Sequence, residues 1–590
     1  MFKPFSTDFM HEFNTLKKNL KKDFTGLKKV RVALLGDTAT QLLNQALTGA
    51  GYDSGYSFEI WEADFNQIER QIFDVTSELY QFQPELVVIF KSSHKLLAKY
   101  NKIKDECQSS FASGEISLIE QLNSSLNSSL RTKVIYFNYP EIDDSVFGSY
   151  ANKVPSSFLF QLRKLNYELM VFASQHPEFY ICDLSAIQNE IGKSNLFHPS
   201  IYINTEMVIS IRALPYVASK VISLIDALSG KFKKCVVLDL DNTIWGGIIG
   251  DDGMENIQIG SLGIGKAFSE FQYWIRKLKK RGVIVAVCSK NMESIAKEPF
   301  LSHPDMVLKL EDIAVFIANW DNKPDNIRQI QKILNIGFDS MVFLDDNPFE
   351  RNIVRENIPC IAVPELPEDP ADYLEFLYSL NLFETASYSD EDAERTKQYQ
   401  TEAQRSSLQQ GFTNEDDFLK SLQMVSVIEP FNKFNSPRVA QLSQRSNQFN
   451  LRTTRYTEGD IEKLLADDNY DTFTFSLSDK FGDNGLICAV ILKRESFQTA
   501  FIDTWFMSCR VLKRGIENLV LNTLVNYTKE KGYEFLRGEY IPTPKNALVK
   551  DHYPNLGFKK DGNSWLLSLS DYQDKKTLIK SEYKWKEAIF

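Results

Sequence analysis

Short apolar runs and longer amphipathic stretches alternate along the first 228 residues. The runs Val30–Leu35, Leu86–Phe90 and Val134–Phe137 are bounded by polar residues and have the length of buried strands. Between them lie stretches such as Phe65–Tyr80 and Ser156–Ser174, where apolar residues recur at helical spacing. Strands that alternate with helices predict a parallel sheet with crossover helices, so we expect a doubly wound α/β domain over residues 1–228.

A second alternation begins after a short basic turn, Leu228–Lys234, where we place a domain boundary. The pattern predicts another α/β domain, with a Rossmann-like parallel sheet, over residues 229–375. Its predicted strands are Val236–Leu238, Gly282–Ser289, Met341–Leu344 and Ile358–Val363.

Polar side chains lie where three of these strands end. Asp239 and Asp241 follow the first, Ser289 ends the second, and Asp345 and Asp346 follow the third. Because ligands in open α/β sheets bind at the carboxyl ends of the strands, we expect these side chains to gather there. Residues i and i+2 share one face of a strand, so the first two carboxylates form a pair. Such a pair suits Mg²⁺, and it can divide nucleophilic attack and proton transfer between its members.

The segment between the first two motifs leaves little room for a cap. Only 47 residues separate Asp241 from Ser289, and a predicted helix, Gly265–Arg281, takes up many of them. The glycine-rich segment Trp245–Gly253 predicts a small β-hairpin flap. Lys323 precedes a further amphipathic stretch and is expected to reach the same edge from a helix start. An open site suits a large substrate, such as a group carried on another protein, although small phosphates also enter open sites.

The last part of the chain has a different pattern. Residues 376–424 are polar and helical, and we interpret them as a helical connector. From residue 425 to 590 strands and helices follow an α+β pattern. The predicted elements are the strands Thr472–Leu477, Leu486–Leu492 and Ala500–Met507 and the helix Ile516–Lys529.

Composition narrows the class of protein. A chain of 590 residues is too long for one core, and 43 % hydrophobic content suffices for several. The net charge of −11 argues against a nucleic-acid binder, because phosphate contacts need a basic surface. Apolar runs are too short for a membrane helix, and the first residues lack the apolar core of a signal peptide. The seven cysteines lack CxxC spacing, which indicates reduced thiols and a cytoplasmic protein.

The carboxylates, hydroxyl and lysine of the central domain, in this order, resemble the four motifs of the haloacid-dehalogenase (HAD) superfamily of phosphotransferases. The resemblance implies that Asp239 is the nucleophile and forms an aspartyl-phosphate. Asp241 would protonate the leaving oxygen and then activate water. Thr243 would orient the loop, and Ser289 and Lys323 would bind the phosphoryl oxygens.

The same resemblance implies a Mg²⁺ site. Its ligands would be Asp239, Asp345 and the backbone carbonyl of Asp241, with Asp346 bound directly or through water. A divalent cation and an ammonium offset the charge that develops when a carboxylate attacks a phosphate.

In the first domain, Gly36-Asp37-Thr38 resembles the GDS block of SGNH hydrolases, with threonine in place of the nucleophilic serine. That family also has an Asp and a His three residues apart near the domain's end, whereas Asp183 and His198 lie far apart here. We therefore expect a degenerate scaffold, or a module that binds carbohydrate or a partner. His94 and His198 are expected to be structural or surface residues.

In the last domain, the loop before the predicted helix resembles the RxxGxG/A loop of GNAT acyltransferases, which holds the coenzyme A pyrophosphate on amides at a helix N-terminus. The resemblance implies a site for coenzyme A or phosphopantetheine, although Lys513 stands where that family has its first glycine. The implied loop residues are Arg510, Lys513, Arg514 and Gly515.

Longer sequence segments narrow the resemblance to FkbH-like proteins of HAD subfamily IIIC. They include Leu238–Gly253, Val287–Asn291, Phe343–Arg351, Gln441–Leu451 and Asp479–Gly485. Such proteins take a three-carbon acyl group from 1,3-bisphosphoglycerate, load it on an acyl carrier protein and remove its phosphate. The resemblance covers roughly residues 230 to 570, and SGNH-like front ends also occur in such proteins.

A thiol is expected to carry the acyl group during transfer, and Cys288, beside Ser289, is the candidate. A thiolate near Mg²⁺ and Lys323 would have a lowered pKa. Adjacent strand residues face opposite sides, however, so a core cysteine is the alternative.

We therefore expect an Mg²⁺-dependent FkbH-like enzyme that acts on a phosphorylated glyceryl-like group, with an acyl carrier protein as partner. One rival is a stand-alone phosphatase for sugar or lipid phosphates. The other is a multidomain binding or assembly protein whose sites have decayed. The intact motif residues count against that rival for the central domain, but not for the two flanking domains.

Overall fold

The computed structural model describes residues 9–584, except 131, 389–394, 410–411, 447, 513 and 544. The chain divides into two compact units between Asp226 and Ala227, close to the expected boundary at residue 228. Each unit is described by itself below.

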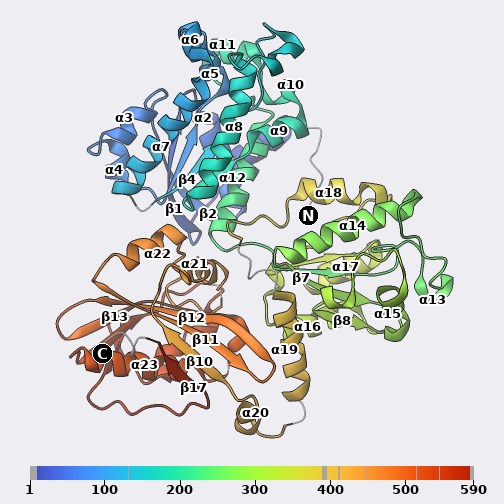
Figure 1. The fold of residues 1–590 in the computed structure, drawn as a ribbon, viewed down its shortest axis with the longest axis vertical. Coiled ribbons are helices and arrows are strands. Elements are labelled where there is room, and N and C mark those ends of the chain that lie inside the picture. The colour runs from blue at the N-terminus through green and yellow to red at the C-terminus, as the bar shows by residue number, and fades with distance from the viewer. Residues whose placement is uncertain are drawn as a thin grey trace. The chain divides into compact units, whose positions relative to one another are not determined.

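The N-terminal unit contains a five-stranded parallel sheet in the order β2-β1-β3-β4-β5 (Figure 1). Parallel neighbours need crossover connections, which the helices supply. The strands are β1 (Lys28–Gly36), β2 (Tyr56–Glu62), β3 (Leu86–Phe90), β4 (Lys133–Phe137) and β5 (Phe179–Cys182). The helices are α1 (Phe9–Asn19), α2 (Gln41–Asp53), α3 (Ile68–Phe73), α4 (Glu78–Phe82), α5 (Ser93–Tyr100), α6 (Asp105–Gln108), α7 (Phe111–Ser129), α8 (Phe158–Gln175), α9 (Leu184–Ile191), α10 (Lys193–Leu196), α11 (Pro199–Thr205) and α12 (Leu214–Leu228).

The three strands expected in this unit are its inner strands β1, β3 and β4. The strands that the pattern missed, β2 and β5, lie at the two edges of the sheet. Most residues of β2 are half-buried or exposed, so it lacks the continuous apolar run that marks the inner strands. The apolar-run criterion therefore detects strands covered on both faces and misses edge strands.

The second unit begins with a four-stranded parallel sheet in the order β8-β7-β6-β9. Alternate residues of its strands enter two separate cores. Val236 and Leu238 belong to one core, and Cys235 and Val237 belong to the other. This is the alternation expected of a sheet covered on both faces. The strands are β6 (Cys235–Leu238), β7 (Ile284–Ser289), β8 (Val315–Ala318) and β9 (Met341–Leu344). The helices are α13 (Ile249–Asp252), α14 (Gly263–Lys280), α15 (Glu293–Ser302), α16 (Lys323–Leu334), α17 (Pro348–Asn357) and α18 (Tyr373–Leu380).

Two details of this sheet differ from expectation. The segment Ile358–Val363 is not a strand, because its only ladder contact is a single parallel bridge between Val342 and Ala362. Instead β8, a four-residue strand, forms the edge beside β7. The pattern missed β8, although its four residues are apolar like those of β6 and β9.

The C-terminal part of the unit contains an eight-stranded mixed sheet in the order β15-β16-β14-β13-β12-β11-β10-β17 (Figure 1). All three strands expected there are present, and the expected helix is α23. The strands are β10 (Val425–Glu429), β11 (Tyr470–Asp479), β12 (Gly482–Arg494), β13 (Thr499–Met507), β14 (Phe535–Glu539), β15 (Lys559–Asp561), β16 (Ser564–Ser568) and β17 (Lys580–Tyr583). The helices, including those of the connector, are α19 (Arg395–Gln409), α20 (Glu415–Ser421), α21 (Ser436–Arg445), α22 (Glu458–Leu465), α23 (Ile516–Glu530) and α24 (His552–Asn555).

Among the described residues, every helix is too short or too polar to span a lipid bilayer.

Candidate active site

Three carboxylates meet at the carboxyl edge of the central sheet. Asp239 follows β6, and Asp345 and Asp346 follow the neighbouring strand β9. Each offers an oxygen that lies within 4.8 Å of an oxygen of the other two. Asp239 and Asp345 are buried, and Asp346 is half-buried. The strand order therefore brings together residues more than 100 positions apart, as the sequence predicted.

Lys323 enters this cluster from the first residue of α16. The helix starts there because Asn322 caps it, accepting a hydrogen bond from the Asp325 backbone N–H at 2.9 Å. The buried Nζ of Lys323 lies 3.0 Å from Oδ1 of Asp239 and forms a second ion pair with Asp345. Burial alone would lower the pKa of Lys323, but the two carboxylates outweigh it and raise the pKa. The lysine is therefore a fixed cation.

One ammonium does not balance three carboxylates. Burial, with the charge of Asp239 added, raises the pKa of Asp345 to about 7, although Lys323 acts in the opposite direction. Burial and Asp239 also raise the pKa of Asp346. A buried cluster with excess negative charge and only oxygen donors fits a hard divalent cation such as Mg²⁺. The residues present therefore match the metal that the sequence implies.

The side chain of Asp241 lies outside this carboxylate group and is held by three donors. Oδ1 accepts hydrogen bonds from Nε1 of Trp245 at 2.9 Å and from the Ile249 backbone N–H at 3.0 Å. Oδ2 accepts one from Nδ2 of Asn291 at 2.8 Å. Any contact of Asp241 with a metal would therefore use its backbone carbonyl, as expected.

Two further motif residues lie in the same network. The Thr243 hydroxyl accepts a hydrogen bond from the Asp346 backbone N–H at 3.1 Å and lies 3.3 Å from its Oδ1. The Ser289 hydroxyl lies 3.2 Å from Nδ2 of Asn291, so one amide links Ser289 to Asp241. Asn291 was not among the predicted site residues. Its position two residues after Ser289, in the same loop, was the available signal.

The glycine-rich segment 245–253, which follows Asp241, has a different structure from the expected hairpin. Residues 245–253 form no hairpin; they contain the single turn of helix α13 and one antiparallel bridge, between Gly246 and Gln258. The hairpin prediction was wrong because the glycines serve another purpose. Gly247 has φ +92°, and its N–H donates to the Asn242 side chain at 2.8 Å, so the chain folds back locally. The described central domain has no larger cap.

Cys288 does not have the environment expected of a reactive thiol. It is fully buried in the core on the face of the sheet that includes Val237 and Phe343. Its Sγ lies 3.8 Å from the Lys323 backbone carbonyl. Burial raises the pKa of Cys288 well above its usual range, and the Lys323 charge only partly opposes this. The expected lowering of its pKa is therefore wrong, because its side chain points into the core.

The two arginine side chains of the predicted pyrophosphate loop pair with other parts of the chain. Arg514 pairs with Glu402 of α19 and with Asp479, whose Oδ2 lies 3.4 Å away, and Arg510 hydrogen-bonds to Gln398 of the same helix. Gly515 has φ +81° and begins α23, as the motif requires. Lys513 lies outside the described residues. The two arginines therefore already have partners on α19 and β11.

The gap between strands β13 and β14, next to this loop, is filled by another segment of the chain. Strands β13 and β14 pair only up to Ile502 and Gly538. Beyond that point the segment 449–451 lies between them. The Leu451 N–H donates to the Trp505 carbonyl at 3.2 Å, and the Ile541 N–H donates to the Leu451 carbonyl at 2.8 Å. An extended ligand could not pair with β13 there without displacing this segment.

In the N-terminal unit the hydroxyl of the GDS-like block lies away from solvent. Thr38 is fully buried, with no hydrogen-bond partner for its hydroxyl. Asp37 accepts a hydrogen bond from the Ser92 backbone N–H at 2.8 Å, and burial raises its pKa to about 7. His94 packs against Phe197 and Tyr202. A threonine without access to solvent cannot attack a substrate, which agrees with a degenerate scaffold.

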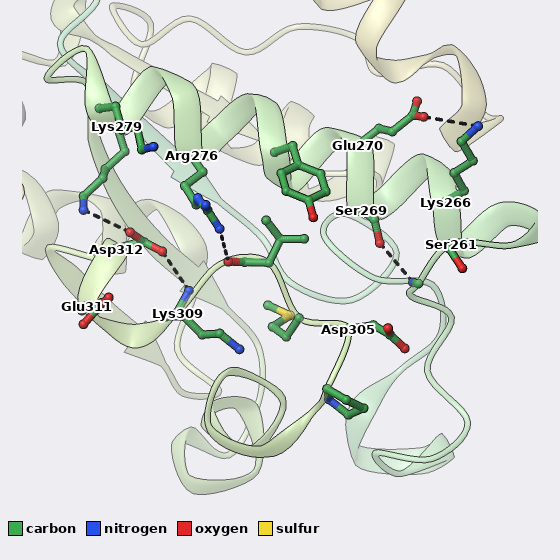
Figure 2. A pocket seen from close by; sticks show the side chains of 16 residues that line it. Ser261, Lys266, Ser269, Glu270, Arg276, Lys279, Asp305, Lys309, Glu311 and Asp312 are labelled. Carbon is green, nitrogen blue, oxygen red and sulfur yellow. Dashed lines mark hydrogen bonds and ion pairs between the residues drawn. The ribbon is translucent and has the colours of Figure 1, made fainter.

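A groove of about 790 Å³ lies away from the carboxylates, between α14 and residues 304–312 (Figure 2). Its lining includes Tyr273, Arg276 and Lys309, but none of the catalytic candidates. The groove is therefore not the active site.

Comparison with known proteins decides the family. A family model described as the N-terminal domain of FkbH matches residues 31–226. A crystal structure from Bacteroides fragilis, described as the N-terminal part of a protein containing a phosphatase domain, complexed with Mg, is 58 % identical. That match covers 64 % of this chain and 99 % of the other, with a TM-score of 0.61. The chain belongs to the FkbH family. No curated protein matches it.

Two acetyltransferase structures match the chain more weakly. The ribosomal-protein-S18-alanine N-acetyltransferase of Escherichia coli is 15 % identical, covers 26 % of this chain over 99 % of its own length, and has a TM-score of 0.21. Mutant forms of the spermidine/spermine N-acetyltransferase SpeG of Vibrio cholerae are 13 % identical, cover 25 % of this chain over 96 % of their own length, and have a TM-score of 0.20.

Proposed function

We propose that the central domain is a Mg²⁺-dependent phosphatase of HAD type. The meeting of Asp239, Asp345 and Lys323 carries the proposal. These residues come from three separate elements, yet the lysine Nζ lies 3.0 Å from Asp239 Oδ1 and pairs with Asp345 as well. Such an arrangement makes a poor core and a good phosphoryl site, because an unpaired negative excess is costly to bury. The Mg complex of the Bacteroides relative supports the choice of metal.

Each site residue then has a distinct task. Asp239 attacks phosphorus to form an aspartyl-phosphate, and Asp241 gives a proton to the leaving oxygen and later takes one from water. Trp245 and Asn291 hold Asp241 in one orientation for both steps. Lys323 and Mg²⁺, when bound, offset the charge of the phosphoryl oxygens.

Exposed apolar side chains around the site support a substrate with a large body. Ile248, Met292, Trp320 and Phe349 are 44, 57, 74 and 65 % exposed. They come from the segments that directly follow β6, β7, β8 and β9, so all four lie at the carboxyl edge of the sheet. Apolar groups that remain in solvent at a polar site favour a contact with a partner surface. We propose that the phosphoryl group is part of a phosphorylated glyceryl unit carried on an acyl carrier protein.

The thiol of such a transfer would be the carrier's own phosphopantetheine, because Cys288 is buried. The same burial favours the second candidate, a stand-alone phosphatase for small phosphate esters, which needs the Asp239 set and no thiol.

Phosphate release tests the proposal. Purified protein with MgCl₂ is incubated with a 3-phosphoglyceryl thioester on a carrier protein, with the same thioester on free pantetheine, and with p-nitrophenyl phosphate. Asp239→Asn is expected to abolish release from all three, whereas Asp251→Asn, an exposed flap carboxylate, keeps it. Release that is unchanged in Asp239→Asn would overturn the phosphatase. Equal kcat/KM for the two thioesters would favour the small-molecule alternative.

The apolar side chains around the site are tested with the same assay. Trp320→Ser is expected to lower kcat/KM for the carrier-borne thioester and to leave that for p-nitrophenyl phosphate unchanged. Phe497→Ser, at an exposed aromatic in the turn between β12 and β13, is the matched control. Equal losses on both substrates for Trp320→Ser would contradict a docking role.

A further inference from the structure

Gln272 is a fully buried polar residue that the proposed chemistry does not use. It lies in α14, among apolar neighbours of the same core such as Phe268, Phe271 and Ile275. A buried amide is costly unless its hydrogen bonds are made. Its partners are therefore informative about its role.

The Gln272 amide joins two loops. Its Nε2 donates to the Ile244 carbonyl at 2.7 Å, and its Oε1 accepts from the backbone N–H groups of Val307 and Leu308, each at 3.0 Å. Ile244 directly follows Thr243 in the loop that begins at Asp239. The donated bond thus reaches the catalytic loop, while the accepted bonds reach the segment that forms part of the groove lining (Figure 2).

The catalytic loop is held from two sides at adjacent residues. On one side the Thr243 hydroxyl bonds to Asp346, and on the other the Ile244 carbonyl bonds to Gln272. Within the loop, the Ile244 N–H donates to the Leu240 carbonyl at 2.9 Å, and Trp245 donates to Asp241. A shift of the Ile244 carbonyl would therefore move its two neighbours: Trp245, which donates to Asp241, and Thr243, which contacts Asp346.

We infer that Gln272 is a positioning residue of the phosphatase site: its donated hydrogen bond sets the place of the loop that holds Asp241 and Thr243. It touches no reacting atom and acts through Ile244. This inference rests on the proposed function for its catalytic consequence, whereas the ordering of the loop is independent of it.

The variant Gln272→Glu distinguishes the hydrogen bond that the amide donates from the two that it accepts. An ionised carboxylate keeps both accepted bonds from Val307 and Leu308, but it cannot donate to the Ile244 carbonyl. Gln272→Leu loses all three bonds and reports the structural contribution. The control is Gln161→Glu in the N-terminal unit, where an equally buried glutamine accepts from the Ala112 N–H at 2.8 Å and donates to the Ser109 carbonyl at 2.9 Å.

Two measurements test the inference. Hydrogen exchange of the full chain is expected to be faster over residues 240–249 in Gln272→Glu, with the rest of the central domain unchanged. With p-nitrophenyl phosphate and MgCl₂, kcat is expected to fall about ten- to hundred-fold with little change in KM, because misplacing a catalytic group by about 1 Å costs as much. A protonated carboxyl can donate again, so the ratio of variant to wild-type kcat should rise as the pH is lowered.

The outcomes separate the failures. Unchanged exchange over residues 240–249 in both Gln272→Glu and Gln272→Leu overturns the inference whatever the activity. Faster exchange with unchanged kcat, or a loss of kcat that is the same at every pH, also overturns it. A wild type without activity on any phosphate ester refutes the proposed function instead, and loop ordering is then judged from exchange alone.

Discussion

Replacing Lys323 by methionine removes the cation that pairs with Asp239 and Asp345. Lys323 has only 3 % of its side chain exposed, and its partners Asp239 and Asp345 have 9 and 0 %. Methionine keeps the volume of the stem but leaves the two buried carboxylates without their partner. Removing one member of a buried ion pair costs about 3–5 kcal/mol.

The lower end of that range is expected here. The pKa of Asp345 is already raised to about 7, and it rises further without the ammonium. Asp345 can then take up a proton at neutral pH, which limits the loss. We therefore expect Lys323→Met to lower the free energy of unfolding of the metal-free protein by about 3 kcal/mol at pH 7.5. Saturating Mg²⁺ should restore part of it, because the cation offsets the same charges.

The assay is urea unfolding in EDTA and in MgCl₂. The transition is monitored by hydrogen exchange of strands β6–β9, so that it reports on the central domain. The matched control is Lys266→Met, which breaks the ion pair with Glu270 in α14, where the side chains are 63 and 54 % exposed. Such a pair contributes about 0–1 kcal/mol. A loss for Lys323→Met no larger than that of the control would refute the electrostatic reasoning.

Three further outcomes are expected. Asp346→Asn should raise the unfolding free energy in EDTA and weaken Mg²⁺ binding measured by calorimetry, because burial and Asp239 disfavour its charged form; a less stable metal-free variant would contradict this. Asn291→Asp should lower kcat more than Asn291→Ser, since it sets a carboxylate where an amide now donates to Asp241, and equal kcat values would argue against that contact. Burial lowers the pKa of His552 to about 3, so the unfolded chain, with a pKa near 6.5, binds the extra proton and stability should fall as the pH drops from about 6.5 towards 3. His552→Phe should flatten that slope in acid unfolding, and an unchanged slope would locate the pH dependence elsewhere.

The local pattern of the chain was enough to locate the catalytic edge. Asp239, Ser289 and Asp345 each lie at or just after the end of an apolar run, and parallel strands bring such ends to one edge of a sheet. Lys323 was placed correctly because the amphipathic stretch that follows it marks a helix start. These features depend only on neighbours in sequence, so they could be predicted without the tertiary structure.

Other features depend on packing between distant segments. Three examples are the face of the sheet on which Cys288 lies, the pairing of Arg514 with α19, and the position of residues 449–451 beside β13. Each depends on which segments pack against each other. Gln272 gave no signal in the sequence, because an amide in an amphipathic helix looks the same whether it faces solvent or a distant carbonyl. The sequence by itself thus determined which groups meet at this edge of the sheet. The tertiary structure alone decided which of the neighbouring groups reach them, because hydrogen bonds and burial between segments far apart in the chain depend on how those segments pack.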